Sequence, residues 1–336
     1  MSEALEEVLR CESFRRALAE QRAVLVEFFG LAEGLFARCA VPMQMPGPSV
    51  WSIERNFFST LFLATYGGLG LSAERRNLYG FMNQCLRALV TGCDNLLDDE
   101  YKDVFGFGPE LHGEKFASVL AILAGDRILF EGLSRRRRAG LLGEEAMATL
   151  VRTSLTALLP SGLEEAAEEG GVVVPLSPTE ILEGVHRVKT GQLFQATLDG
   201  PLALGEISKA QYETVGRALS DFGVACQLLD DLVDLARDAG DRRYNYALAT
   251  LGCGGAKVAS PGHFRDVPDV SIEVAALSLE HFQTAWGVLG PLLDADDSLG
   301  RRAAQSVFEL LGVSELWPVA SGRVQRRVAK RLSCEG

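Results

Sequence analysis

The sequence predicts an all-α protein with a single domain over residues 1–336. Apolar residues recur at three- and four-residue intervals along the chain, which is the spacing of one helix face. No long polar linker interrupts this periodicity. With 47% hydrophobic and 23% charged residues, the chain has the composition of an ordinary globular protein and enough length for one large core.

The first half of the chain is predicted to be a series of helices separated by proline and glycine. Pro42, Pro46 and Pro48 interrupt the first apolar pattern. Ser72 is a good N-cap for a long helix that ends in an acidic cluster. The predicted segments are two helices over 4–39, a helix at 51–66, the helix after Ser72, a loop at 101–113 and a helix at 114–133.

The clearest helix start in the second half is Ser177-Pro178-Thr179-Glu180. It combines an N-cap serine, proline at the first helical position and glutamate three residues after the cap. This helix is expected to relax at Gly191. Before it, a helix over 143–158 is expected to end near Pro160, with a polar connection at 161–176. The remaining segments are a long helix at 206–236, a loop at 252–270 and helices after 271.

Composition argues against several classes of partner. The net charge of −12 disfavours nucleic acid and anionic membranes, because both attract basic surfaces. No apolar run approaches the roughly 18 residues that a membrane span needs. Seven cysteines without a CxxC pair, and four histidines outside any zinc-ligand spacing, favour reduced thiols in the cytoplasm and no zinc site.

An acidic stripe follows the apolar run at 222–229. Asp230, Asp234 and Asp238 are spaced by one helical turn, and Asp231 lies beside them. Like charges at this spacing repel one another, so the stripe needs a cation. Mg²⁺ suits it, because this ion takes oxygen ligands from one or two carboxylates and completes its shell with waters and substrate phosphates.

A second acidic cluster lies upstream, with Asp94 and Asp98 one turn apart and Asp99 and Glu100 adjacent. Two such carboxylate rows on facing helices would hold a diphosphate through bridging Mg²⁺ ions. We therefore expect more than one magnesium ion as the cofactor and a diphosphate ester as the substrate.

At four places the chain resembles the class I isoprenoid diphosphate synthases of the trans-polyprenyl synthase type. Its Asp230-Asp231-Leu232-Val233-Asp234 matches the family's second DDxxD motif, and Gln227 precedes it as in FQxxDD. Asp94-Asn95-Leu96-Leu97-Asp98 stands at the first DDxxD. The other two matches are Lys189-Thr190-Gly191-Gln192-Leu193-Phe194 for KTGxLF and Ala121-Ile122-Leu123-Ala124-Gly125-Asp126 for AILxGD.

The resemblance implies an all-helical bundle around a central active-site cavity, often dimeric, and a role for each matching residue. The implied metal ligands are Asp94, Asp98, Asp99, Asp230, Asp231 and Asp234. The implied catalytic residues are Lys189, Thr190 and Gln227, and the implied diphosphate-binding residues are Arg187, Lys189, Arg242 and Arg243. Leu89, Val90 and Phe194 are assigned to the hydrocarbon-tail pocket, with plain core packing as the alternative for Leu89 and Val90. We also expect Asp231→Ala to abolish diphosphate release and leave the fold intact.

The chain departs from the family where the second substrate, isopentenyl diphosphate, would bind. No arginine stands between Glu100 and Arg127, and the family's Gly-Lys-x-x-Arg element is reduced to Arg55 without its lysine. Guanidinium groups matter there because they pair bidentately with phosphate oxygens. Three hypotheses therefore stay open: a prenyltransferase acting on an allylic prenyl diphosphate, a class I terpene cyclase, and a non-catalytic partner subunit.

Overall fold

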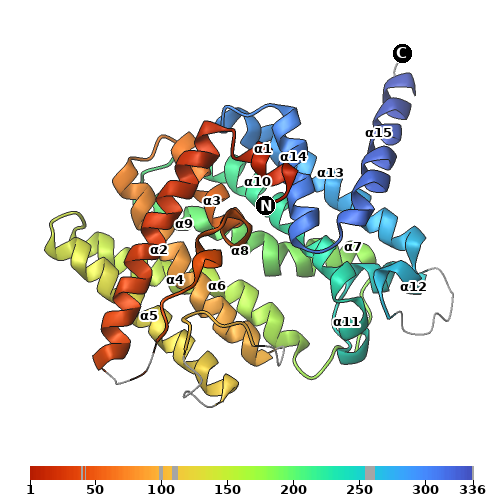
Figure 1. The fold of residues 1–336 in the computed structure, drawn as a ribbon. Coiled ribbons are helices and arrows are strands. Elements are labelled where there is room, and N and C mark those ends of the chain that lie inside the picture. The colour runs from red at the N-terminus through yellow and green to blue at the C-terminus, as the bar shows by residue number, and fades with distance from the viewer. Residues whose placement is uncertain (39–40, 42, 98–100, 108–112, 254–261, 335–336) are drawn as a thin grey trace. The chain divides into compact units, whose positions relative to one another are not determined.

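The computed structural model describes residues 1–336 except 39–40, 42, 98–100, 108–112, 254–261 and 335–336. The described part is helical and contains no strand; one isolated β-bridge joins Met43 and Phe107 (Figure 1). The predicted all-α fold class is confirmed. The chain divides into two compact units, which are treated separately below. The single domain over residues 1–336 stays a prediction.

The first unit, called the α4 unit, comprises residues 9–156 and 197–208. Its buried aromatic core includes Phe28, Phe57 and Phe81. Helices α4 and α5 approach closely because glycines line their contact: a Cβ at Gly132 would lie 2.2 Å from the Phe81 ring. The unit contains α2 (Glu12–Arg38), η1 (Pro48–Trp51), α3 (Ile53–Gly68), α4 (Ala73–Leu97), α5 (Glu114–Arg138), the first half of α6 (Glu144–Glu168) and α9 (Asp199–Ala203).

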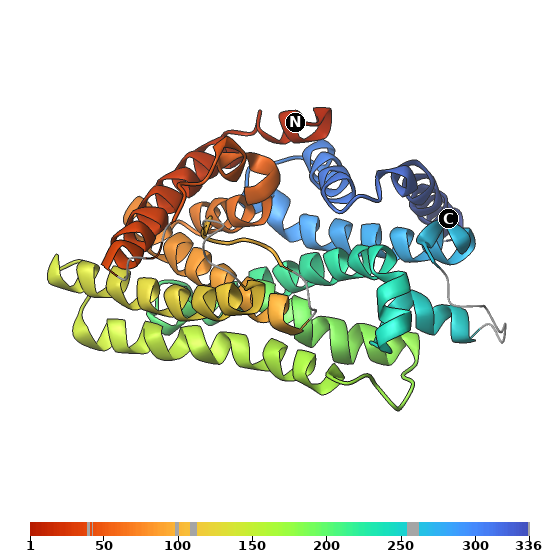
Figure 2. The same ribbon diagram turned by 60° about the horizontal axis from the view of Figure 1, so that its bottom comes forward.

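The second unit, called the α10 unit, comprises residues 1–8, 157–196 and 209–336. Its centre is the antiparallel pair α10 (Lys209–Val233) and α13 (Pro268–Leu292), drawn in teal and light blue in Figure 2. The other elements are α1 (Glu3–Val8), α7 (Pro178–Glu180), η2 (Ile181–Gly191), α8 (Gln192–Gln195), η3 (Ala196–Leu198, shared with the α4 unit), α11 (Leu235–Asp241), α12 (Tyr246–Cys253), η4 (Phe264–Asp266), α14 (Asp297–Leu310), η5 (Ser314–Leu316) and α15 (Trp317–Cys334).

The helix that carries the KTGxLF match begins at Ser177 as predicted. The Ser177 hydroxyl accepts the N–H of Glu180, and the Glu180 carboxylate accepts the N–H of Ser177, which is a complete capping box. From Ile181 to Gly191 the backbone is a π-helix, a form that recurs at functional sites. Gly223 lets this segment lie against α10, because a Cβ there would be 2.8 Å from the Thr190 carbonyl oxygen.

The predicted end of a helix near Pro160 is wrong. Helix α6 continues through Pro160 to Glu168. Proline removes one backbone hydrogen bond from a helix interior, at a cost of about 3 kcal/mol. Tertiary contacts hold the last two turns in place, since the Glu165 carboxylate pairs with Lys189 and the Glu168 carboxylate accepts the N–H of Tyr244. This continuation brings two carboxylates to the KTGxLF segment.

The predicted long helix at 206–236 is two helices. Helix α10 ends at Val233, Asp234 interrupts the regular backbone, and α11 starts at Leu235. The backbone hydrogen bonds from Asp234 to Asp230 and from Asp238 to Asp234 persist across the interruption. The acidic stripe therefore lies on the junction of two helices, with Asp231 and Asp238 buried.

Candidate functional site

Asp231 is the most deeply embedded carboxylate of the second acidic motif, with 2% of its surface exposed. Its Oδ2 accepts hydrogen bonds from His186 Nε2 at 2.8 Å and from the Tyr246 backbone N–H at 2.6 Å. Its Oδ1 accepts a bond from Gln227 Nε2 at 3.3 Å. Asp231 thus joins α10, η2 and α12 of the α10 unit.

Asp230 and Asp234 are more accessible than Asp231. Burial, reinforced by the charges of Asp234 and Asp231, raises the pKa of Asp230 to about 7. Burial also raises the pKa of Asp238 to about 7. Because crowded carboxylates resist ionisation until a cation arrives, this donor set suits a hard divalent ion.

Thr190 and Gln227 connect the KTGxLF segment to the acidic motif. The Thr190 hydroxyl donates a hydrogen bond to the Gln227 side-chain oxygen. The Gln227 amide then donates to Asp230 Oδ2 at 3.4 Å, besides its bond to Asp231. The structure therefore brings two of the three predicted catalytic residues into direct contact at the edge of the carboxylates.

Lys189 lies in the same region but is engaged by carboxylates. Its Nζ is 2.7 Å from Glu165 Oε1 and 4.0 Å from Glu168 Oε1. Burial lowers the pKa of the Lys189 ammonium, but the two glutamates outweigh this effect and leave the pKa above its ordinary value. Lys189 is therefore a permanent cation at neutral pH.

The three predicted diphosphate-binding arginines differ in their surroundings. Arg243 lies 3.4 Å from Glu165 and thereby shares a carboxylate with Lys189. Arg242 has a left-handed backbone with φ of 57° and donates from its guanidinium to the Gly170 carbonyl oxygen at 3.0 Å. Arg187 forms ion pairs with Glu183 at 3.0 Å and Asp221 at 3.1 Å. Among the three, Arg243 is the one that joins Lys189.

In the first acidic motif, Asp94 lies on α4, whereas Asp98 and Asp99 lie outside the described residues. The neighbouring Asn95 is buried, and its side chain forms two hydrogen bonds with the backbone of Lys102. Its Oδ1 accepts the Lys102 N–H at 2.9 Å, and its Nδ2 donates to the Lys102 carbonyl oxygen at 3.0 Å. An aspartate could not make the second bond. The departure from the family at this position therefore has a structural reason.

The predicted tail-pocket residues are half-buried. Leu89 and Val90 lie on α4, where Leu89 contacts α5 near Gly125. Phe194 of α8 stacks on Phe222 of α10 with ring centroids 6.2 Å apart. Leu89 and Val90 belong to the α4 unit and Phe194 to the α10 unit, so their joint role stays a prediction.

The α4 unit contains a cavity of about 490 Å³ that the sequence analysis did not identify. Three cationic side chains line it: Arg55 from α3, Arg87 from α4, and Lys102. Neither Arg55 nor Arg87 forms an ion pair with any described residue. Asp103 is the acidic residue of the lining, and its Oδ1 accepts the backbone N–H groups of Phe105 and Gly106. The lining is cationic overall and fits an anionic ligand.

Arg87 is the site residue that sequence reasoning missed. Its side chain lines the cavity and is exposed to solvent. Arg87 precedes Asp94 by seven residues, which is two turns of the same helix face or about 10 Å along the axis. This spacing, which places an arginine on the same helix face as an acidic motif, was the feature of the sequence that could have identified Arg87 as a site residue.

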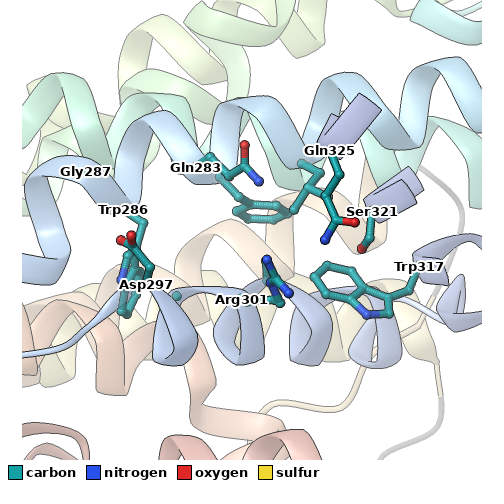
Figure 3. Close-up of a pocket in the computed structure, with 12 residues that line it drawn as sticks. Gln283, Trp286, Gly287, Asp297, Arg301, Trp317, Ser321 and Gln325 are labelled. Atoms are coloured by element: carbon teal, nitrogen blue, oxygen red, sulfur yellow. The ribbon is translucent and has the colours of Figure 1, made fainter. Parts of the chain in front are cut away.

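Another cavity, of about 350 Å³, lies in the α10 unit between α13, α14 and α15. Figure 3 shows Gln283 and Trp286 of α13, Arg301 of α14 and Trp317 of α15 around it. Trp286 is anchored by its indole N–H, which donates to the Asp296 carbonyl oxygen at 3.1 Å. No predicted site residue lines this cavity.

No described group of three or more histidine, cysteine, aspartate or glutamate side chains is arranged to hold a metal ion by itself. No described helix is both long and apolar enough to cross a membrane.

The fold is that of the polyprenyl synthases. A solved polyprenyl synthase from Caulobacter crescentus CB15, complexed with calcium and isoprenyl diphosphate, superimposes with a TM-score of 0.59 over 90% of this chain and 96% of that chain, at 15% identity. No protein-family model matches the sequence.

Two curated proteins are similar in sequence. The chain is 28% identical over 187 residues to the farnesyl diphosphate synthase of Escherichia coli (strain K12), covering 53% of this chain and 60% of that protein. It is 33% identical over 146 residues to the geranylgeranyl diphosphate synthase of Pseudescherichia vulneris, covering 43% and 47%. The matches thus span about half the length of these relatives. Together with the fold, they support the trans-polyprenyl synthase superfamily, in agreement with the resemblance in the motifs.

Proposed function

We propose that the chain is a magnesium-dependent prenyltransferase that ionises an allylic isoprenoid diphosphate and transfers the prenyl group to an acceptor. The observation that carries this proposal is the cluster on η2 and α10. There Thr190 and Gln227 are hydrogen-bonded beside Asp230, and Lys189 is on the same segment as Thr190. Carboxylates for metal and a cation for phosphate are thus built into one unit.

Asp230 and Asp234 are the residues of the α10 unit that would hold Mg²⁺, and Asp94, with Asp98 and Asp99 from the sequence, would serve the α4 unit. Bound Mg²⁺ neutralises charge that develops on the departing diphosphate. The relative from Caulobacter crescentus was solved with calcium and isoprenyl diphosphate, which supports a divalent ion here. Asp231 acts through Gln227 and His186, because its own oxygens are already engaged.

Lys189 and Arg243 are the protein cations for the leaving diphosphate. A fixed cation aimed at developing negative charge contributes several kcal/mol in a water-poor site. Gln227 acts on the leaving diphosphate only indirectly. It accepts a hydrogen bond from the Thr190 hydroxyl and donates one to Asp230, so it holds these two side chains in place. For the hydrocarbon tail, the candidate apolar residues are Leu89 and Val90 in the α4 unit and Phe194 in the α10 unit, each considered within its own unit.

The acceptor carries an anionic group that binds in the cavity lined by Arg55, Arg87 and Lys102. Isopentenyl diphosphate fits this chemistry, because its diphosphate can pair with two guanidinium groups. The cavity favours the transferase over the cyclase hypothesis, since a cyclase uses one diphosphate substrate and needs no second anion site.

Product analysis tests the function. The purified protein would be incubated with geranyl, farnesyl or geranylgeranyl diphosphate and Mg²⁺, with and without isopentenyl diphosphate. We expect longer prenyl diphosphates when both substrates and Mg²⁺ are present. Neutral hydrocarbons or alcohols from the allylic substrate alone would identify a cyclase instead. If no tube yields a product or pyrophosphate, the result would favour the non-catalytic partner subunit.

A further inference from the structure

The last two turns of α6 place two carboxylates on the cations assigned to the diphosphate. Glu165 Oε1 lies 2.7 Å from Lys189 Nζ, and Glu165 Oε2 lies 3.4 Å from the Arg243 guanidinium. Glu168 Oε1 is 4.0 Å from Lys189 Nζ. All four side chains belong to the α10 unit. Glu165 therefore bridges Lys189 and Arg243, and Glu168 lies farther from Lys189.

The segment that carries these glutamates is fastened to the chain around Arg243. The Tyr244 backbone N–H donates to Glu168 Oε2 at 3.0 Å, and the Val172 N–H donates to the Arg242 carbonyl oxygen at 2.8 Å. Glu168 is held by these surroundings, since only 1% of its side chain is exposed. Glu165 has no such anchor among the described residues, where its carboxylate pairs with Lys189 and Arg243.

The charges of this group cancel. Lys189 and Arg243 contribute two positive charges, and Glu165 and Glu168 contribute two negative charges. The Asp231 carboxylate adds a further favourable charge at Lys189. Without substrate, the two cations are therefore fully compensated by the protein. A diphosphate that pairs with these cations therefore competes with the carboxylates already on them.

We infer that Glu165 is a positioning residue that competes with the diphosphate for Lys189 and Arg243, while Glu168 stays on Lys189 as its permanent partner. This inference rests on the proposed function, because it takes these cations as the diphosphate site. Glu165 turns away when the diphosphate arrives and re-pairs when it leaves. Its presence weakens diphosphate binding and speeds the release of the product pyrophosphate.

Charge-matched variants test the competition. Glu165→Gln removes the competing charge, whereas Glu169→Gln removes the same charge from an exposed neighbour whose side chain forms no hydrogen bond or ion pair with the described residues. Inorganic pyrophosphate with Mg²⁺ is the probe, and calorimetry measures its dissociation constant. We expect about tenfold tighter binding in Glu165→Gln, the effect of removing one close charge of opposite sign from the cations, and no change in Glu169→Gln.

A second variant, Glu165→Asp, distinguishes a change in binding from a loss of folding. Glu165→Asp keeps the charge and shortens the side chain by one methylene, so that it reaches Lys189 less well. We expect pyrophosphate affinity between those of the wild type and Glu165→Gln. In steady-state assays with an allylic diphosphate, Glu165→Gln should lower KM without raising kcat, because product release becomes slower. A merely structural glutamate would raise KM and lower the unfolding temperature in both variants.

The outcomes separate this inference from the proposed function. Equal pyrophosphate affinity in the wild type and Glu165→Gln, or weaker affinity in the variant, overturns the competition but leaves the prenyltransferase proposal standing. If neither the wild type nor any variant binds pyrophosphate with Mg²⁺, the diphosphate site fails, and the inference fails with it.

Discussion

Gly223→Ala is expected to destabilise the protein, although the same change in a helix usually stabilises it. A glycine-to-alanine change inside a helix ordinarily gains about 0.5–1 kcal/mol. At Gly223, however, the new Cβ would lie 2.8 Å from the Thr190 carbonyl oxygen and 3.1 Å from the Phe194 ring. Ordinary contact begins near 3.4 Å, so η2 would have to move about 0.6 Å from α10.

The magnitude follows from that displacement. Overpacking by one methyl group costs about 1–3 kcal/mol, so the free energy of unfolding should fall by about 1–2 kcal/mol after the helix gain is subtracted. Displacing Thr190 from Gln227 and Lys189 from its partners should also slow the reaction about tenfold, given that a shift of about 1 Å can cost a hundredfold.

Urea denaturation and initial rates of pyrophosphate release measure the two effects. Gly184→Ala is the matched control on the same π-helix, because a Cβ there would have nothing within 4 Å and the residue is exposed. The control should be neutral or slightly stabilising. A Gly223→Ala protein as stable and active as the wild type would refute the close packing of η2 on α10 as the device that positions Lys189 and Thr190.

Three further predictions concern the α4 unit. Arg87→Gln should raise KM for isopentenyl diphosphate by about tenfold and leave KM for the allylic substrate unchanged, whereas the exposed Arg127→Gln should alter neither; equal effects on both substrates would contradict an acceptor site. Asn95→Asp should lower the unfolding temperature by a few degrees in thermal denaturation, because the Lys102 carbonyl oxygen loses its donor. Leaving a buried acceptor unpaired costs about 1–3 kcal/mol. The exposed Phe116, Leu123 and Phe130 share one face of α5 at seven-residue intervals, so we expect this face to form a homodimer and Leu123→Glu to shift it to monomer in sedimentation velocity; a wild-type monomer at micromolar concentration would contradict this.

Sequence reasoning reached the helices and the second acidic motif because both depend on local spacing. The capping box at Ser177 is written in four consecutive residues, and the stripe Asp230–Asp234 follows from one helical turn. The same local reasoning failed at Pro160. There the outcome depends on long-range partners, since Lys189 and Tyr244 are contacted by carboxylates beyond the proline.

The cationic cavity shows the same limit. Its arginines come from two helices, α3 and α4; Arg55 stands in a degraded match to the family's Gly-Lys-x-x-Arg element, and Arg87 belongs to no motif that can be recognised along the chain. The segment after the first acidic motif contains no arginine before Arg127, whereas Arg87 precedes that motif. Spatial convergence of single residues from separate helices leaves no local pattern.

The structure changes the expected effect of Asp231→Ala on the stability of the fold. From the sequence, this carboxylate was expected to be an exposed ligand whose loss would spare the fold. In the structure it is 2% exposed and accepts bonds from His186, Tyr246 and Gln227. Removing it leaves the buried His186 without this partner and the Tyr246 N–H without its acceptor, and an unpaired buried group costs about 1–3 kcal/mol.

We therefore expect Asp231→Ala to lose several degrees in unfolding temperature as well as activity. Asp231→Asn is the more informative variant, because it keeps the shape and one acceptor oxygen but loses the charge. If Asp231 supports the site from behind, the asparagine variant should retain Mg²⁺-dependent pyrophosphate binding at reduced stability. If it ligates the metal directly, that variant should stay folded and lose Mg²⁺-dependent binding altogether. Calorimetry and thermal denaturation on the same two proteins distinguish the supporting role from the ligand role.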